Sequence, residues 1–272
     1  MLPAMLTLGN LLCGFAAIHF AAKPVASTGV FGWSTLTVAG SLIFVGMFFD
    51  AIDGFVARLV KSTSVFGANL DSLADIVTFG VAPAFMMLRL VSHYYGPDGT
   101  TSIMGPEVDS VYAKFAWAIA AVYICCTGLR LARFNAETSA AGGEEHRTFH
   151  GLPSPGAAGA VASLIVLHQH LLPREMAPQS ELLLARSSAA VIPAVTLLVA
   201  LAMVSRMRYP HVANRYLQGR QDFATLVKVV LPIAAAVWWP QISLAVAFSI
   251  YALSGPIRAL RRRTPTESTP TG

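Results

Sequence analysis

The chain has 272 residues, of which 55% are hydrophobic and 12% charged, and its mean hydropathy is +0.60. Soluble domains carry about 25% charged residues, so this composition excludes an ordinary water-soluble protein and predicts a protein embedded in a membrane. The net charge of +5 follows from an uneven placement of lysine and arginine along the chain, so it does not indicate nucleic acid as a partner.

Hydrophobic segments long enough to cross a bilayer, which takes about 20 residues as helix, recur along the chain. The first contains Asn10 and lacks a positive region before it, so we interpret it as a retained span and not a cleaved signal. The last two are short and could form one broken helix, which would give seven spans. The sequence therefore predicts an all-α, polytopic bundle of about eight transmembrane helices, at residues 4–22, 35–58, 69–92, 113–134, 154–172, 187–205, 223–238 and 240–256.

Lysine and arginine are distributed unevenly between the two sides that these spans define. With the N-terminus inside, four of these residues fall in outer segments and fourteen on the inner side, the latter being Arg58, Lys61, Arg130, Arg133, Arg147, Arg206, Arg208, Arg215, Arg220, Lys228, Arg258, Arg261, Arg262 and Arg263. Cytoplasmic segments are enriched in lysine and arginine. We therefore expect cytoplasmic termini in a bacterial inner membrane protein, with one transmembrane domain over residues 1–257 and a basic, disordered tail over 258–272.

Four aspartates are concentrated within 26 residues, although the whole chain has only 14 acidic residues. Asp50 and Asp53 are spaced i, i+3 at the end of the second span, and Asp71 and Asp75 are spaced i, i+4 at the start of the third. Residues at these spacings share one face of a helix. Because the connection between the two spans is short, we expect an antiparallel hairpin in which the four carboxylates converge near the cytoplasmic surface.

Partly buried carboxylates at these spacings repel one another unless positive charge compensates them. Two Mg²⁺ or Mn²⁺ ions, with pyrophosphate oxygens completing their coordination, would turn this repulsion into a binding site. The alternative for any single aspartate is an ordinary helix-end carboxylate paired with Arg58 or Lys61. Gly54 and Ala57 carry almost no side chain and would let a nucleotide or phosphate approach the helix closely, and Arg58 offers a planar fork to a phosphate.

The full spacing is D-x2-D-G-x2-A-R-x8-G-x3-D-x3-D, which specifies eight positions across 26 residues. This pattern resembles the signature of the CDP-alcohol phosphotransferase family. Segments spread from the first span to the last are similar to the branch of the family that transfers a phosphatidyl group from CDP-diacylglycerol to L-serine and releases CMP. These segments are TLGNLLCGF (7–15), FGANLDSLADIVTFGVAPA (66–84), LRLARFN (129–135), GLPSP (151–155), MVSRMRYP (203–210) and YALSGP (251–256).

The resemblance implies a role for each residue of the pattern. The four aspartates would bind the metal ions, and Asp75 would also act as the general base. The CDP moiety would be contacted by Gly54, Ala57, Arg58 and Gly67, and by Asn10 from the first span. The resemblance also implies a homodimer surrounded by membrane lipids.

Candidates for binding the acceptor alcohol lie at the inner end of the fourth span. Arg130 and Arg133 are spaced i, i+3, Asn135 follows, and a guanidinium suits the carboxylate of serine. The alternative is that these arginines only set the topology. His150 and Ser154 could line the same cavity, but for them a structural role is the favoured interpretation. Other acceptors, namely glycerol 3-phosphate, an inositol phosphate or choline, stay open.

A transporter of divalent cations is the remote alternative. Such a protein would place acidic residues near the midplane of the bilayer, at an interface between repeats. Here the aspartates lie at the inner edge, and transport gives no reason for small residues and an arginine at fixed offsets between them. The enzyme is therefore the favoured prediction.

Overall fold

The computed structural model describes residues 2–25, 32–59, 65–96, 103–107, 109–140, 151–171, 179–207, 209 and 238–261. The long elements in this part of the chain are all helices, so the expected all-α bundle is confirmed. They are α1 (Leu2–Ala22), α2 (Thr35–Leu59), α3 (Val65–Asp75), the π-helix η2 (Ile76–Val81), α4 (Ala82–Tyr95), α5 (Val111–Ala140), α6 (Ser154–Leu171), α7 (Gln179–Val204) and α10 (Pro240–Arg261).

Within the described residues, six helical segments are long and apolar enough to cross a membrane: α1, α2, the continuous run α3–η2–α4, α5, α7 and α10. The sequence also predicted a span over 154–172, but α6 is not among the six. Helix α6 packs against α2, α4, α7 and α10, and most of its residues are buried. Because its surface faces protein, it does not need a continuous apolar exterior. Of the predicted span 223–238, residues 223–237 lie outside the described residues.

Two helices extend beyond their predicted ends. Helix α5 continues from the expected end at residue 134 to Ala140, so the following loop begins later than the sequence indicated. Glu137 of this extension forms an i, i+4 ion pair at 2.7 Å with Arg133 one turn earlier, and Asn135 Nδ2 donates to Ser72 Oγ at 2.8 Å. Helix α10 continues to Arg261, into the segment expected to form the tail.

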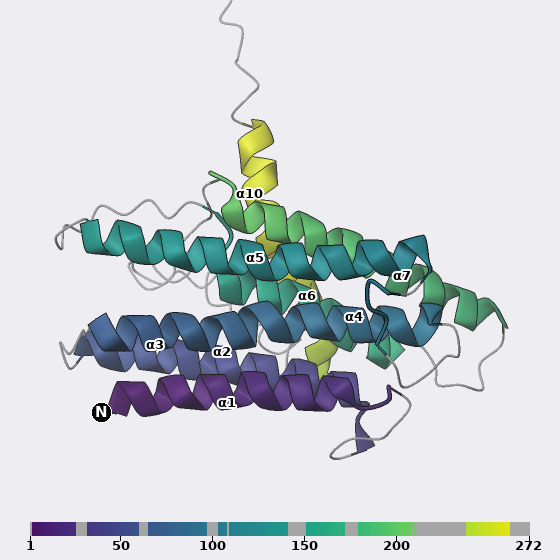
Figure 1. Ribbon diagram of the computed structural model, residues 1–272, viewed down its shortest axis with the longest axis horizontal. Helices are drawn as coiled ribbons and strands as arrows, with labels where there is room; N and C mark the ends of the chain where they lie inside the picture. The colour runs from purple at the N-terminus through teal and green to yellow at the C-terminus, as the bar shows by residue number, and fades with distance from the viewer. Residues whose placement is uncertain are drawn as a thin grey trace, which may run out of the picture.

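The first helices form a layer of nearly parallel rods (Figure 1). Helix α1 packs along α2 and also contacts α3, η2 and α4, and α5 packs on α7. Helix α10 is inclined steeply to the others in this view and packs mainly on α6. The beginnings of α1 and α3 and the end of α5 lie at the same end of the bundle. The layer therefore brings the aspartate helices, α2 and α3, against α1.

The third span contains a π-helical segment directly before a proline. Pro83 has no N–H, so it cannot donate to the carbonyl of Phe79 four residues earlier. The Tyr123 hydroxyl of α5 donates to that carbonyl at 3.1 Å, and the Ala82 N–H donates five residues back to Val77. The backbone groups freed by Pro83 are thus satisfied inside the bundle, as a membrane interior requires.

Candidate active site

The structure brings together three of the four predicted aspartates. Asp50, Asp53 and Asp71 each offer a carboxylate oxygen, and these oxygens lie within 4.8 Å of one another. Two of the carboxylates come from α2 and one from α3. The helical spacings place them on facing sides of the two helices, so the cluster sits between neighbouring elements of the first layer.

Asp75 lies one turn beyond this group, at the last residue of α3. It is only 6% exposed, and its Oδ1 accepts a hydrogen bond of 3.1 Å from Asn10 Nδ2 of α1. Its charge interacts with Asp50 and Asp71, and with the guanidinium of Arg130. Asp75 therefore belongs to the same electrostatic site as the other three, but it has a polar partner of its own.

The chemistry of this cluster fits a divalent cation. Asp71 Oδ1 is buried, and no side chain in the described part of the chain hydrogen-bonds to it. Among the side chains that the structure describes, none forms an ion pair with any of the four aspartates. Converging carboxylate oxygens without a positive partner are the ligand set that Mg²⁺ and Mn²⁺ favour. The residues present therefore fit the metal that the sequence predicted.

The predicted nucleotide contacts flank the aspartates. A Cβ added to Gly54 would meet no described atom within 4 Å beyond its own stretch of helix, so this face of α2 is open. Ala57 is half-buried one turn further along, and Gly67 is half-buried in the first turn of α3. The side chain of Arg58 lies outside the described part of the structure. Asn10 is fully buried and faces Asp75.

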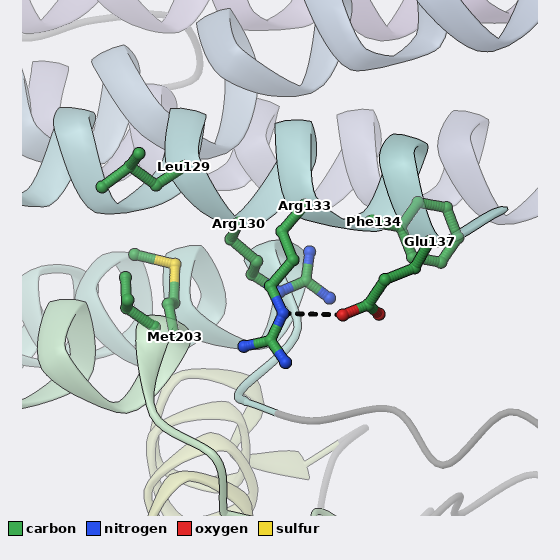
Figure 2. Close-up of a pocket in the computed structure, with 7 residues that line it drawn as sticks. Leu129, Arg130, Arg133, Phe134, Glu137 and Met203 are labelled. Carbon is green, nitrogen blue, oxygen red and sulfur yellow. Dashed lines mark hydrogen bonds and ion pairs between the residues drawn. The ribbon is translucent and has the colours of Figure 1, made fainter. Parts of the chain in front are cut away.

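The predicted acceptor residues separate into two environments. Arg130 is half-buried, its Nη1 donates to Ser154 Oγ at 3.0 Å, and its Nε is buried without a partner among the described residues. Arg133 is exposed and paired with Glu137, as Figure 2 shows. Both arginines line one small pocket, together with Leu129, Phe134, Glu137, Met203 and Val204.

Ser154 has a polar contact that the sequence did not reveal. It is 1% exposed and opens α6, directly facing Arg130. The segment before it is fixed on the end of α7: the Gly151 N–H donates to Met207 O at 2.8 Å, and the Leu152 N–H donates to Ala202 O at 3.1 Å. Gly151 has φ of 87°, a conformation that favours glycine. The signal available in the sequence was the GLPSP segment itself.

A helical bundle of membrane-spanning length, with carboxylates converging between two helices, defines a membrane protein with a candidate divalent-cation site. The chain belongs to the CDP-alcohol phosphatidyltransferase family, whose sequence pattern matches residues 1–204.

Three similar proteins share the name CDP-diacylglycerol–serine O-phosphatidyltransferase. The one from Helicobacter pylori is 27% identical over 260 residues, which is 95% of this chain and 90% of that protein. The one from Methanocaldococcus jannaschii is 30% identical over 221 residues, covering 81% and 84% of the two chains. The one from Bacillus subtilis is 34% identical over 172 residues, covering 63% and 78%.

Proposed function

We propose that this protein transfers a phosphatidyl group from CDP-diacylglycerol to the hydroxyl of L-serine, giving phosphatidylserine and CMP. The observation that carries the proposal is the cluster of Asp50, Asp53 and Asp71 between α2 and α3, in a chain whose similar proteins bear the name of this reaction. A membrane-embedded site suits the reaction because its donor and its product are lipids.

Two Mg²⁺ or Mn²⁺ ions are the proposed cofactors, held by Asp50, Asp53, Asp71 and Asp75. When bound, the metal supplies positive charge that stabilises the phosphate oxygens of the donor. Gly54 and Ala57 leave the surface of α2 low enough for the CDP moiety to approach, and we assign further CDP contacts to Arg58, Gly67 and Asn10.

Asp75 is the proposed general base. Its Oδ1 is held by Asn10, which leaves the other oxygen with two lone pairs, one for the metal and one for the proton of the serine hydroxyl. The serine oxygen then forms a bond to the phosphorus that carries diacylglycerol, the bond from that phosphorus to the CMP oxygen breaks, and CMP leaves. Groups of the site that are already oriented before the reaction balance the negative charge on the phosphate of the departing CMP.

Arg130 is the proposed partner of the serine carboxylate. Its charge lies close enough to Asp75 to interact with it, so a carboxylate bound at this guanidinium would place the serine hydroxyl near the base. A cationic acceptor such as choline would meet a like charge here. Arg133 and Asn135 would contribute to the same pocket from the next turns of α5.

The positive charges of the sequence support a site that faces the cytoplasm, in a bacterial inner membrane protein with both termini inside. The proposed assembly is a homodimer in membrane lipid.

The reaction can be tested with purified protein, CDP-diacylglycerol and Mg²⁺ or Mn²⁺, by following CMP release with serine, glycerol 3-phosphate, an inositol phosphate or choline. We expect CMP release with serine and not with the other three acceptors. EDTA should abolish this release, and added metal should restore it. Arg130→Gln should raise the KM for serine about tenfold or more through loss of a charge-assisted hydrogen bond. Arg186→Gln, the same chemical change at an exposed arginine of α7 outside this pocket, is the matched control. Release with another acceptor in preference to serine would contradict the proposal.

A further inference from the structure

Helix α1 contributes no acidic residue, yet two of its side chains contact the aspartates. Thr7 Oγ1 donates to Asp53 Oδ2 at 2.9 Å, and Asn10 Nδ2 donates to Asp75 Oδ1 at 3.1 Å. Thr7 and Asn10 are spaced i, i+3 and therefore share a face of α1. One bond goes to a carboxylate of α2 and the other to a carboxylate of α3, so α1 bridges the two aspartate helices.

The two donors are buried: Thr7 is 4% exposed and Asn10 is 0% exposed. Hydrogen bonds from neutral groups to carboxylates are stronger than those between neutral groups, and a low dielectric strengthens them further. At this depth the bonds hold the carboxylates in fixed orientations.

Close packing fixes the backbone of α1 at the same place. Thr78 Oγ1 of η2 donates to the backbone oxygen of Asn10 at 2.9 Å. A Cβ on Gly14 would lie 2.8 Å from Thr78 Cα, and one on Gly46 of α2 would lie 2.9 Å from Asn10 Oδ1. Glycine is therefore needed at both positions for α1, α2 and η2 to approach so closely. The side chain of Asn10 starts from a backbone that has little freedom to shift.

We propose that Thr7 and Asn10 are positioning residues, which orient the carboxylates of Asp53 and Asp75 so that their remaining oxygens converge with Asp71 on a divalent cation. The inference rests on the metal site of the proposed function and assigns to α1 the orientation of two of the site's carboxylates. A carboxylate with one oxygen fixed by a donor presents the other in a defined direction, and such supporting bonds raise metal affinity. Asp71 Oδ1 is buried without a partner among the described residues, and Asp71 offers an oxygen within 4.8 Å of those of Asp50 and Asp53.

The test measures metal binding without substrate. Purified protein in detergent is titrated with Mn²⁺, and free Mn²⁺ is followed by electron paramagnetic resonance. Thr7→Val keeps the shape of the side chain but removes the donor, and we expect it to weaken Mn²⁺ binding about tenfold or more, the usual effect of losing such a supporting bond. Thr7→Ser keeps the hydroxyl and should bind Mn²⁺ like the wild type. Asn10→Leu should weaken binding as Thr7→Val does.

Thr196→Val is the matched control. Thr196 is also fully buried, but its hydroxyl donates to Ile192 O within α7, away from the aspartates. We expect unchanged Mn²⁺ binding for this variant, and thermal unfolding should show that every variant is folded. Wild-type affinity for Mn²⁺ in Thr7→Val, or equal losses of affinity in Thr7→Ser and Thr7→Val, would overturn this inference. Neither result would contradict the proposed function. If the wild type itself did not bind Mn²⁺, the metal site of the proposed function would be wrong as well.

If Thr7→Val failed to fold, the comparison of Thr7→Ser with the wild type would still decide. Retained Mn²⁺ affinity in Thr7→Ser, together with a loss in Asn10→Leu, would support the inference. A loss in Thr7→Ser would overturn it, because that variant keeps the donor.

Discussion

At the scale of single residues, the four aspartates are not equivalent. Asp50, Asp53 and Asp71 present oxygens to one another, whereas Asp75 is buried at the end of α3 with Asn10 on one oxygen and the charge of Arg130 nearby. Asp53 also has a donor, Thr7, so the hydrogen bond alone does not distinguish a base from a metal ligand. Asp75 is the aspartate whose charge interacts most strongly with Arg130, the proposed partner of the serine carboxylate, and a base must lie near the hydroxyl from which it takes the proton.

Replacement of Asp75 by Asn should therefore lower kcat by about 100-fold or more, the usual contribution of a general base. The amide has nearly the same shape, so the fold should survive, and the KM for CDP-diacylglycerol should change much less than kcat. The measurement is CMP release at saturating serine. Asp109→Asn, the same chemical change at an exposed residue before α5, should keep full activity. An Asp75→Asn enzyme with normal turnover would contradict the assignment.

The aspartate cluster could be predicted from the sequence because helical periodicity fixes which residues share a face, and a short connection keeps the end of one helix close to the beginning of the next. The bonds from Thr7 and Asn10 could not, because their partners are 46 and 65 residues away and depend on how α1 lies against the hairpin. The environment of Ser154 could not be predicted for the same reason. Its contact with Arg130 depends on a turn at Gly151 that is fixed by the far end of α7.

At the scale of elements, the π-helix η2 separates the part of the third span that carries site residues from the part that packs in the core. Before it, α3 presents Asp71 and Asp75 to α1 and α2; after it, α4 is packed in the core with most of its residues buried. A π segment shifts the helical register, so the two halves can face different neighbours. Pro83 was visible in the sequence, but the form of the irregularity depends on Tyr123 of α5 satisfying the freed carbonyl.

Two glycines of the first layer should respond to alanine in opposite ways. Gly54 has open space at its Cβ position, so Gly54→Ala should preserve or raise the unfolding temperature, since alanine is favoured over glycine in a helix by about 1 kcal/mol. Its KM for CDP-diacylglycerol should nevertheless rise, because the methyl group would occupy the surface that the nucleotide approaches.

Gly14→Ala is the contrasting change. Its methyl group would press on Thr78, and overpacking of this kind costs about 1–3 kcal/mol, so the unfolding temperature should fall. Thermal unfolding in detergent and CMP release at varied CDP-diacylglycerol measure both effects. An unchanged KM in Gly54→Ala would remove Gly54 from the nucleotide site.

At the scale of the whole molecule, the distribution of positive charge and the order of the helices distinguish the same two ends of the bundle. The beginnings of α1 and α3 and the end of α5 share one end of the bundle, and this end carries the aspartates, Arg130 and Arg133. Lys23 and Lys114 lie at the opposite ends of their helices, where the sequence has few other positive residues. A water-soluble acceptor and the released CMP would enter and leave at the end that bears the site.

This polarity predicts which side of the membrane each end faces. In a variant with Cys13, Cys125 and Cys126 replaced by alanine, a single cysteine is placed at Ser110, before α5, or at Ala136, near its end; both positions are exposed. A membrane-impermeant maleimide should label position 110 in intact cells, and position 136 only after the membrane is opened, because segments rich in arginine stay in the cytoplasm. CMP release by both variants confirms that the labelled proteins are native. The reverse labelling would put the active site outside the cell, where CDP-diacylglycerol made inside would not meet it, so it would overturn the orientation and with it the proposed access route for serine.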